Sequence, residues 1–157
     1  MLEMKNVTYI YEDQTVALKD ISMDLSKGSC IGIIGSNGAG KSTLFLNFTG
    51  VLRPKQGQIF YDEKPMKYDK ASLRELRKQV SIVFQDPDKQ IFFSKVYDDV
   101  AFALRNLGVD EKEINRIVNI ALASVGAKDF ADKPVHFLSH GQKKRVAIAG
   151  VIAMDSE

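Results

Sequence analysis

The sequence predicts an α/β fold built around a phosphate-binding loop, and three observations support this prediction. The segment Gly35-Ser36-Asn37-Gly38-Ala39-Gly40-Lys41-Ser42-Thr43 matches the loop pattern G-x-x-x-x-G-K-[ST]. The apolar run 29–34 before it is typical of a buried strand, and residues 42–48 can open a helix, which gives the strand–loop–helix order of such a loop. In residues 92–135 the apolar residues recur at helical spacing, which predicts a helical subdomain packed on the core.

The composition is that of one globular domain, because 45% of the 157 residues are hydrophobic and 27% are charged. A net charge of +2 gives no reason to expect nucleic acid as a partner. Nothing resembles a signal peptide or a bilayer-spanning run, so we expect a cytoplasmic protein that reaches the inner face of the membrane through another subunit. The single cysteine, Cys30, excludes an internal disulfide and is expected to be an inert buried thiol.

The remaining elements are predicted from alternation and helical spacing. Alternating apolar residues predict strands at 2–11 and 16–25, an antiparallel layer that leads into the core. Gly108 is expected to end a helix, and Asp110 with Glu113 resembles a capping box for the next one. Further strands are predicted at 58–61 and 80–84, and helices at 72–78, 96–107 and 114–122.

The phosphate-binding loop has a direct chemical interpretation. Its three glycines let the backbone wind round a phosphate, and the loop amides then form an anion nest at a helix N-terminus. Lys41 is expected to reach the β- and γ-phosphates, and the Ser42 hydroxyl is expected to bind Mg²⁺. A glycine-rich turn in some other α/β protein is the alternative, but the spacing, the lysine, the serine and the flanks all argue against it.

Gln85 follows the predicted strand 80–84, and its carbonyl and amide suit a magnesium-bound water or the γ-phosphate region. Pro87 biases Asp86 away from helical backbone, so a loop is expected to begin there. A solvated loop glutamine is the alternative, and the position after a core strand favours the functional interpretation.

Ser139 and Gly141 lie where a last helix is predicted to begin, with Ser139 as its N-cap. A helix N-terminus with small residues can bind an anion. An ordinary capped helix with a basic first turn is the alternative, and for this segment taken alone it is the better interpretation.

Taken together, the phosphate loop, Gln85 and Leu138-Ser139-His140-Gly141-Gln142 resemble, in this order, the ATP-binding-cassette family. The segments 83–92, 99–108 and 141–150 are similar to the importer ATPases of the cobalt and energy-coupling-factor type. His140 stands where the broad family usually has glycine, and this subfamily tolerates side chains there.

The resemblance implies ATP and Mg²⁺ as ligands and a head-to-tail dimer with a second ATPase subunit. Tyr11 would stack on adenine, although a strand tyrosine packing on a neighbour is the alternative. Ser139, Gly141 and Gln142 would contact the nucleotide bound to the partner's loop, and Gln85 would sense nucleotide and Mg²⁺. The Gln85 loop would also contact a transmembrane transporter subunit.

The implied function is to power an importer for cobalt, another metal ion or a vitamin. A soluble cassette ATPase of DNA repair or translation is one alternative, and those proteins usually carry coiled-coil or long charged insertions. A non-catalytic nucleotide-binding fragment is the other.

The resemblance covers only the N-terminal part of a cassette. We expect a partial nucleotide-binding domain over 1–157, with the β layer and α/β core at 1–91, the helical subdomain at 92–137 and the signature with its helix at 138–157. Asp155 and Glu157 are rejected as the family's catalytic Asp-Glu pair, since Ser156 separates them. In the family, the Asp-Glu pair, a switch histidine and two central strands of the core sheet follow the signature helix. Because residues 1–157 show none of these, we expect this chain alone to be inactive.

Overall fold

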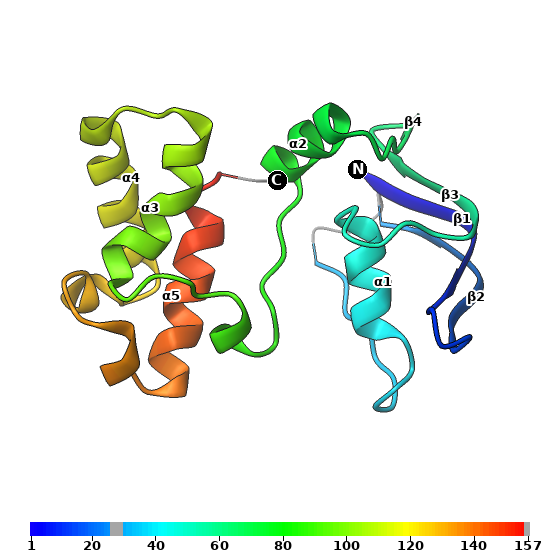
Figure 1. The fold of residues 1–157 in the computed structure, drawn as a ribbon, viewed down its shortest axis with the longest axis horizontal. Helices are drawn as coiled ribbons and strands as arrows, with labels where there is room; N and C mark the ends of the chain where they lie inside the picture. Colours follow the sequence, from blue (N-terminus) through cyan, green and yellow to red (C-terminus); the bar gives the residue numbers. More distant parts are fainter. Residues whose placement is uncertain (26–29, 156–157) are drawn as a thin grey trace. The chain divides into compact units, whose positions relative to one another are not determined.

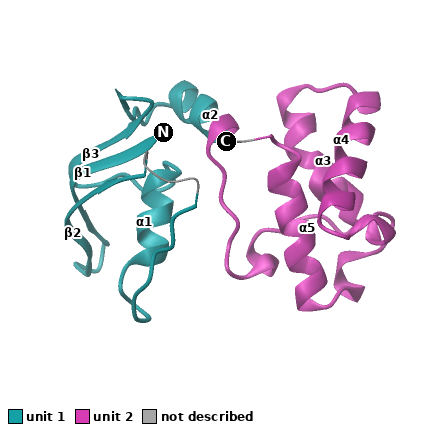
Figure 2. Cartoon of the chain, turned by 180° about the vertical axis from the view of Figure 1, so that it is seen from behind, with its two compact units in different colours: residues 1–77 teal, residues 78–157 magenta. Residues whose placement is uncertain are grey.

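The computed structural model describes residues 1–25 and 30–155. The chain forms two compact units, Met1–Arg77 (unit 1) and Lys78–Glu157 (unit 2), coloured teal and magenta in Figure 2. Each unit has its own hydrophobic core.

Unit 1 contains an antiparallel sheet, whose four described strands have the order β2-β1-β3-β4. Figure 1 shows α1 lying along this sheet, and its residues Leu44 and Phe48 join the sheet residues in one core. The predicted strands 2–11, 16–25 and 58–61 and the predicted helix 72–78 are therefore confirmed within a residue or two. The elements are β1 (Leu2–Ile10), β2 (Val16–Asp24), α1 (Lys41–Phe48), β3 (Gln56–Tyr61), β4 (Lys64–Pro65) and α2 (Lys70–Gln79).

A bulge in β1 sets which of its residues face the core. Met4 and Val7 are both buried although three positions separate them, which simple alternation does not allow. Between them the register with β2 shifts, and Asn6 has a φ of 51°. The Asn6 amide donates to Ser22 Oγ at 2.9 Å, so the irregular backbone is hydrogen-bonded. The bulge therefore returns Val7 to the core face.

Two predicted strands do not form. Residues 30–34 have no strand structure, and the Ile34 side chain is 98% exposed. Residues 80–84 likewise run without strand pairing. Apolar composition makes a segment compatible with a strand, but a strand also needs a neighbouring strand, and neither run belongs to a β-ladder in the described part of the chain. Cys30 is accordingly exposed, and the prediction of a buried thiol is wrong.

Unit 2 is a helical unit, as the periodicity predicts. Its three long helices pack against one another around a core that contains Val100, Val118 and Val146, all fully buried. Gly108 ends α3 with a φ of 80°, as expected. The elements are η1 (Pro87–Lys89), α3 (Val96–Leu107), α4 (Glu111–Ser124), η2 (Lys128–Phe130), η3 (Val135–Phe137) and α5 (His140–Ile152).

The N-terminus of α4 differs in one detail from the expectation. Asp110 is the N-cap, and its carboxylate accepts from the amides of Lys112 and Glu113. The Glu113 carboxylate pairs with Arg116, one turn along the helix, at 2.6 Å. The cap therefore forms, while Glu113 is engaged with a guanidinium instead of completing a capping box.

Candidate nucleotide-binding site

Glycines shape the phosphate loop at its junction with α1. Gly38 and Gly40 have φ values of 80° and 84°, in the region that favours glycine. A Cβ on Gly40 would lie 2.4 Å from the carbonyl oxygen of Ala17 in β2. Gly40 is therefore required twice, by its backbone angle and by the close approach of a strand.

Lys41 closes over the loop that precedes it. Its ammonium donates to the carbonyl oxygens of Gly35 and Ser36, both at 2.7 Å. Lys41 is also the first residue of α1, where the amides of the first turn have no intrahelical acceptor. The loop thus gathers a cation and unpaired amides in one place, which suits a polyanion.

The two residues after Lys41 differ in exposure. Ser42 is exposed, so its hydroxyl can reach a metal ion held by a phosphate. Thr43 is 5% exposed, and its hydroxyl is hydrogen-bonded to the Tyr11 hydroxyl at 2.9 Å. The loop residues therefore fit Mg²⁺ at Ser42, with Thr43 facing inward.

Tyr11 lies just beyond β1, and its hydrogen bond to Thr43 brings it next to the phosphate loop. Its side chain is 36% exposed, and its ring meets that of Tyr9 edge-on, with centroids 5.0 Å apart and planes at 84°. A face of the Tyr11 ring can therefore serve a planar group, while the neighbouring tyrosine fixes the ring.

Gln85 belongs to unit 2, and the phosphate loop belongs to unit 1. The Gln85 side chain is exposed and follows residues 80–84, which form no strand. The next residue, Asp86, caps η1 by accepting from the Asp88 amide at 3.1 Å. The predicted loop after Gln85 is thus an ordered turn.

Ser139 and Gln142 form a reciprocal capping box at the start of α5. The Ser139 hydroxyl accepts from the Gln142 amide at 3.3 Å, and the Gln142 side chain accepts from the Ser139 amide at 2.8 Å. The predicted N-cap is confirmed. A Cβ on Gly141 would meet nothing within 4 Å, so packing within the described chain does not require glycine there.

Three further residues connect the predicted sites within unit 2 and were not anticipated. Lys143, Lys144 and Gln90 join the Gln85 loop to α5 through side-chain hydrogen bonds. Sequence patterns do not reveal these contacts, because most of the acceptors are backbone carbonyl groups some sixty positions away.

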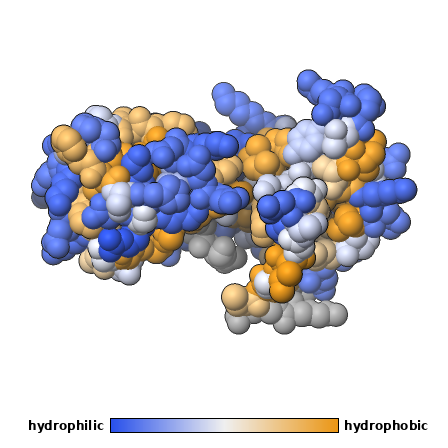
Figure 3. Space-filling model, turned by 90° about the horizontal axis from the view of Figure 1, so that it is seen from below, coloured by the Kyte–Doolittle hydropathy of each residue, from blue (hydrophilic) through white to orange (hydrophobic). Residues whose placement is uncertain are grey.

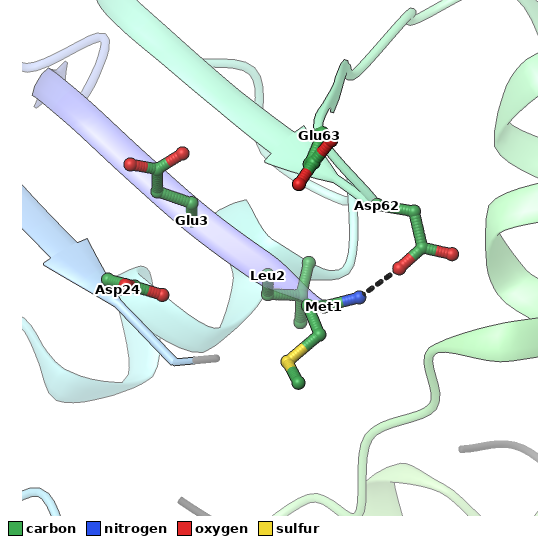
Figure 4. Close-up of a pocket in the computed structure, with 6 residues that line it drawn as sticks. All are labelled: Met1, Leu2, Glu3, Asp24, Asp62 and Glu63. Carbon is green, nitrogen blue, oxygen red and sulfur yellow. Dashed lines mark hydrogen bonds and ion pairs between the residues drawn. The ribbon is translucent and has the colours of Figure 1, made fainter. Parts of the chain in front are cut away.

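A pocket in unit 1 lies apart from all predicted site residues (Figure 4). The Met1 amine pairs with Asp62 at its edge. The pocket is lined by Met1, Leu2, Glu3, Asp24, Asp62 and Glu63. Over residues 1–25 and 30–155, no group of three or more His, Cys, Asp and Glu side chains is arranged to hold a metal ion.

Aromatic side chains are exposed in unit 2 after the Gln85 loop. Phe92 is 78% exposed, and the rings of Phe93 and Phe102 lie 5.3 Å apart. Figure 3 shows hydrophobic side chains reaching the surface among hydrophilic ones. No helix in the described part of the chain is long and apolar enough to cross a membrane.

Comparison with known sequences gives consistent matches. The family model described as ABC transporter matches residues 18–157. A putative ABC transporter ATP-binding protein of Listeria monocytogenes is 56% identical over the whole chain. The energy-coupling factor transporter ATP-binding protein EcfA of Methanocaldococcus jannaschii is 51% identical over the whole chain. The cobalt import ATP-binding protein CbiO of Salmonella typhi is 48% identical over 99% of it.

The chain spans 59%, 56% and 57% of the lengths of these three relatives. Among solved structures, cbiO1 of Clostridium perfringens, part of the transporter complex cbiONQ, has a TM-score of 0.86 and 48% identity, over 99% of this chain and 62% of that one. The dimeric ATP-binding cassette MJ0796 bound to ADP and Pi has a TM-score of 0.89 and 27% identity, over 99% of this chain and 71% of that one.

Proposed function

We propose, since this chain belongs to the ABC transporter family, that it is the ATP-binding part of a subunit that powers an energy-coupling-factor importer. The predicted resemblance and fold class are confirmed by the matches to the family and to cassette structures. The observation that carries the proposal is the phosphate loop, in which the Lys41 ammonium and the unpaired amides of α1 lie together.

The ligand that suits this site is ATP with Mg²⁺. The triphosphate would accept hydrogen bonds from the loop amides and from Lys41. The present acceptors of Lys41 are two neutral carbonyl groups, which a phosphate can replace. Ser42 offers an exposed hydroxyl to the metal ion, and the Tyr11 ring is available to adenine. Bound Mg²⁺ would neutralise charge on the phosphates, and Gln85 is proposed to sense that region.

A second ATPase subunit is the first proposed partner. The N-terminus of α5 presents Ser139, Gly141 and Gln142, and the lack of any packing reason for Gly141 supports close approach by a group from outside the chain. The matched MJ0796 structure is a dimer, which supports a head-to-tail pair here.

A transmembrane transporter subunit is the second proposed partner. The Phe92, Phe93 and Phe102 side chains form an exposed aromatic surface shortly after Gln85. Such side chains favour a protein partner that buries them. This contact would place the protein at the inner face of the membrane, and no nucleic acid partner is proposed.

Cobalt, another metal ion or a vitamin is the proposed solute class. The names of the relatives EcfA and CbiO support it, because they refer to energy-coupling factor transport and to cobalt import. These names also favour transport over a soluble ATPase of DNA repair or translation.

Substitution of Lys41 tests the proposal. We predict that Lys41→Ala in the full-length protein removes most ATP affinity, because the loop amides cannot replace a point charge among phosphates. Titration calorimetry measures the affinity, and Lys112→Ala, at an exposed lysine of α4, is the matched control. Equal ATP affinity in the wild-type and Lys41→Ala proteins would refute the assignment of the loop.

A further inference from the structure

The Gln85 loop is joined to α5 by three side chains of unit 2. The Lys144 ammonium donates to the carbonyl oxygens of Phe84 and Gln85 at 2.9 and 2.7 Å. The Lys143 ammonium pairs with Asp88 at 2.6 Å. These contacts tie the residues around Gln85 to the helix whose N-cap is Ser139.

Gln90 completes the connection from the side of the loop. Its side-chain amide donates to the carbonyl oxygen of Ala147 in α5 at 3.2 Å. Its side-chain oxygen accepts from the Phe84 amide at 2.9 Å. Residues 80–84 form no strand, and the side chains of Gln90 and Lys144 supply the hydrogen bonds of the Phe84 amide and carbonyl groups.

Lys144 is the strongest of the three connections. It gives two charge-assisted hydrogen bonds to two successive carbonyl groups, and its side chain is partly buried. The Lys143 pair involves Asp88, which is 57% exposed, so solvent screens it. Gln90 makes only neutral hydrogen bonds.

We propose that Lys144 is a positioning residue that sets the backbone at Gln85 from the signature helix α5. The Gln85 loop and the Ser139 end of α5 then move as one body. The proposal rests on the proposed function for the roles of Gln85 and Ser139, while the mechanical link rests on the contacts alone.

Hydrogen–deuterium exchange of the full-length protein tests the mechanical link. Lys144→Met keeps the aliphatic stem and removes the donors, so amides of residues 80–90 should exchange about tenfold faster, the change expected for loss of charge-assisted hydrogen bonds. Lys144→Arg keeps a cation with several donors and should stay near wild type. Lys112→Met is the matched control. Unchanged exchange in Lys144→Met, or equally faster exchange throughout α3, α4 and α5, would overturn the proposal.

ATP hydrolysis by the intact transporter tests the positioning role. Lys144→Met should lower kcat while the KM for ATP stays unchanged, because the substitution removes the hydrogen bonds to Phe84 and Gln85 and leaves those of Lys41 with Gly35 and Ser36. Lys144→Arg should restore kcat. A parallel change of kcat and KM, or no change, would overturn the role. If Lys41→Ala leaves ATP binding intact, the proposed function fails, and the exchange experiment still decides whether Lys144 holds the loop.

Discussion

Hydrogen bonds hold Lys41 of the phosphate loop and the neighbouring Tyr11 in place. Lys41 donates to two carbonyl groups of its own loop, and Tyr11 is hydrogen-bonded to Thr43. The Lys41 contacts are neutral-acceptor hydrogen bonds, which are weaker than an ammonium–phosphate contact. A phosphate that entered the loop could therefore replace these carbonyl groups as the acceptor of the Lys41 ammonium.

Tyr11 gives a residue-scale prediction that separates its ring from its hydroxyl. Tyr11→Ala in the full-length protein should weaken ATP binding by about 1–3 kcal/mol, the range for stacking of a base on an aromatic ring. Tyr11→Phe should keep the affinity, because the ring face makes the contact and only the hydrogen bond to Thr43 is lost. Calorimetry of the two variants measures the difference. An equal loss in both would assign the effect to the Thr43 contact, and no loss in either would make Tyr11 a packing residue.

At the scale of the element, Asp99 connects α3 to the exposed segment that precedes it. Its Oδ1 atom accepts from the amides of Phe92 and Phe93 at 2.8 and 3.1 Å. Burial raises the pKa of the Asp99 carboxyl, and the two backbone hydrogen bonds only partly oppose that rise. Asp99 therefore holds the aromatic surface in place at the cost of a partly buried charge.

The raised pKa of Asp99 predicts the pH dependence of a substitution. An acid whose pKa is raised on folding stabilises the fold below its unfolded pKa, and this contribution is lost as pH rises through the folded pKa. Asp99→Asn keeps the acceptor oxygen without the charge, so at neutral pH it should be at least as stable as wild type. That advantage should shrink as pH falls through the raised folded pKa and should be gone below about 4, where an unperturbed aspartate is protonated.

Thermal unfolding of the full-length protein at several pH values measures this effect. Asp99→Ala is the contrasting variant, because it leaves two amides without an acceptor and should lose about 1–2 kcal/mol at neutral pH. A neutral-pH loss in Asp99→Asn as large as in Asp99→Ala would show that the charge itself stabilises the contact.

At the scale of the whole molecule, the chain contains two units with separate cores and matches 56–59% of the length of the first two relatives. The runs 30–34 and 80–84 precede the phosphate loop and Gln85, and neither forms a strand in the described structure. Each predicted site is therefore held by contacts within its own unit, such as Tyr11 with Thr43 in unit 1 and Lys144 with Gln85 in unit 2.

A protein consisting of residues 1–157 should not hydrolyse ATP. The reason is that phosphoryl transfer depends on positioning, and the segments expected to position the phosphate loop and Gln85 form no strands in the described part of the chain. Some phosphate binding can persist, because Gly35–Thr43 is local in sequence. Phosphate release by this protein, by its Lys41→Ala variant and by a version extended at the C-terminus to the length of the relatives measures the difference. Lys41-dependent turnover at a rate near that of the extended version would contradict the prediction.

The sequence alone determined the parts that depend on neighbours a few positions away. The glycine pattern of the phosphate loop, the end of α3 at Gly108 and the N-cap role of Ser139 are all such features. Each uses backbone angles or hydrogen bonds within one or two turns, so residue type and spacing are sufficient to predict it.

Only the tertiary structure decided the features that need a distant partner. Residues 30–34 and 80–84 have strand-like sequences, but a strand exists only when another segment pairs with it. The Tyr11–Thr43 hydrogen bond spans 32 positions, and Lys144 reaches carbonyl groups 60 and 59 positions away. A backbone carbonyl carries no residue-type signal, so the sequence does not name the acceptor of a lysine, and only the fold brings the two together.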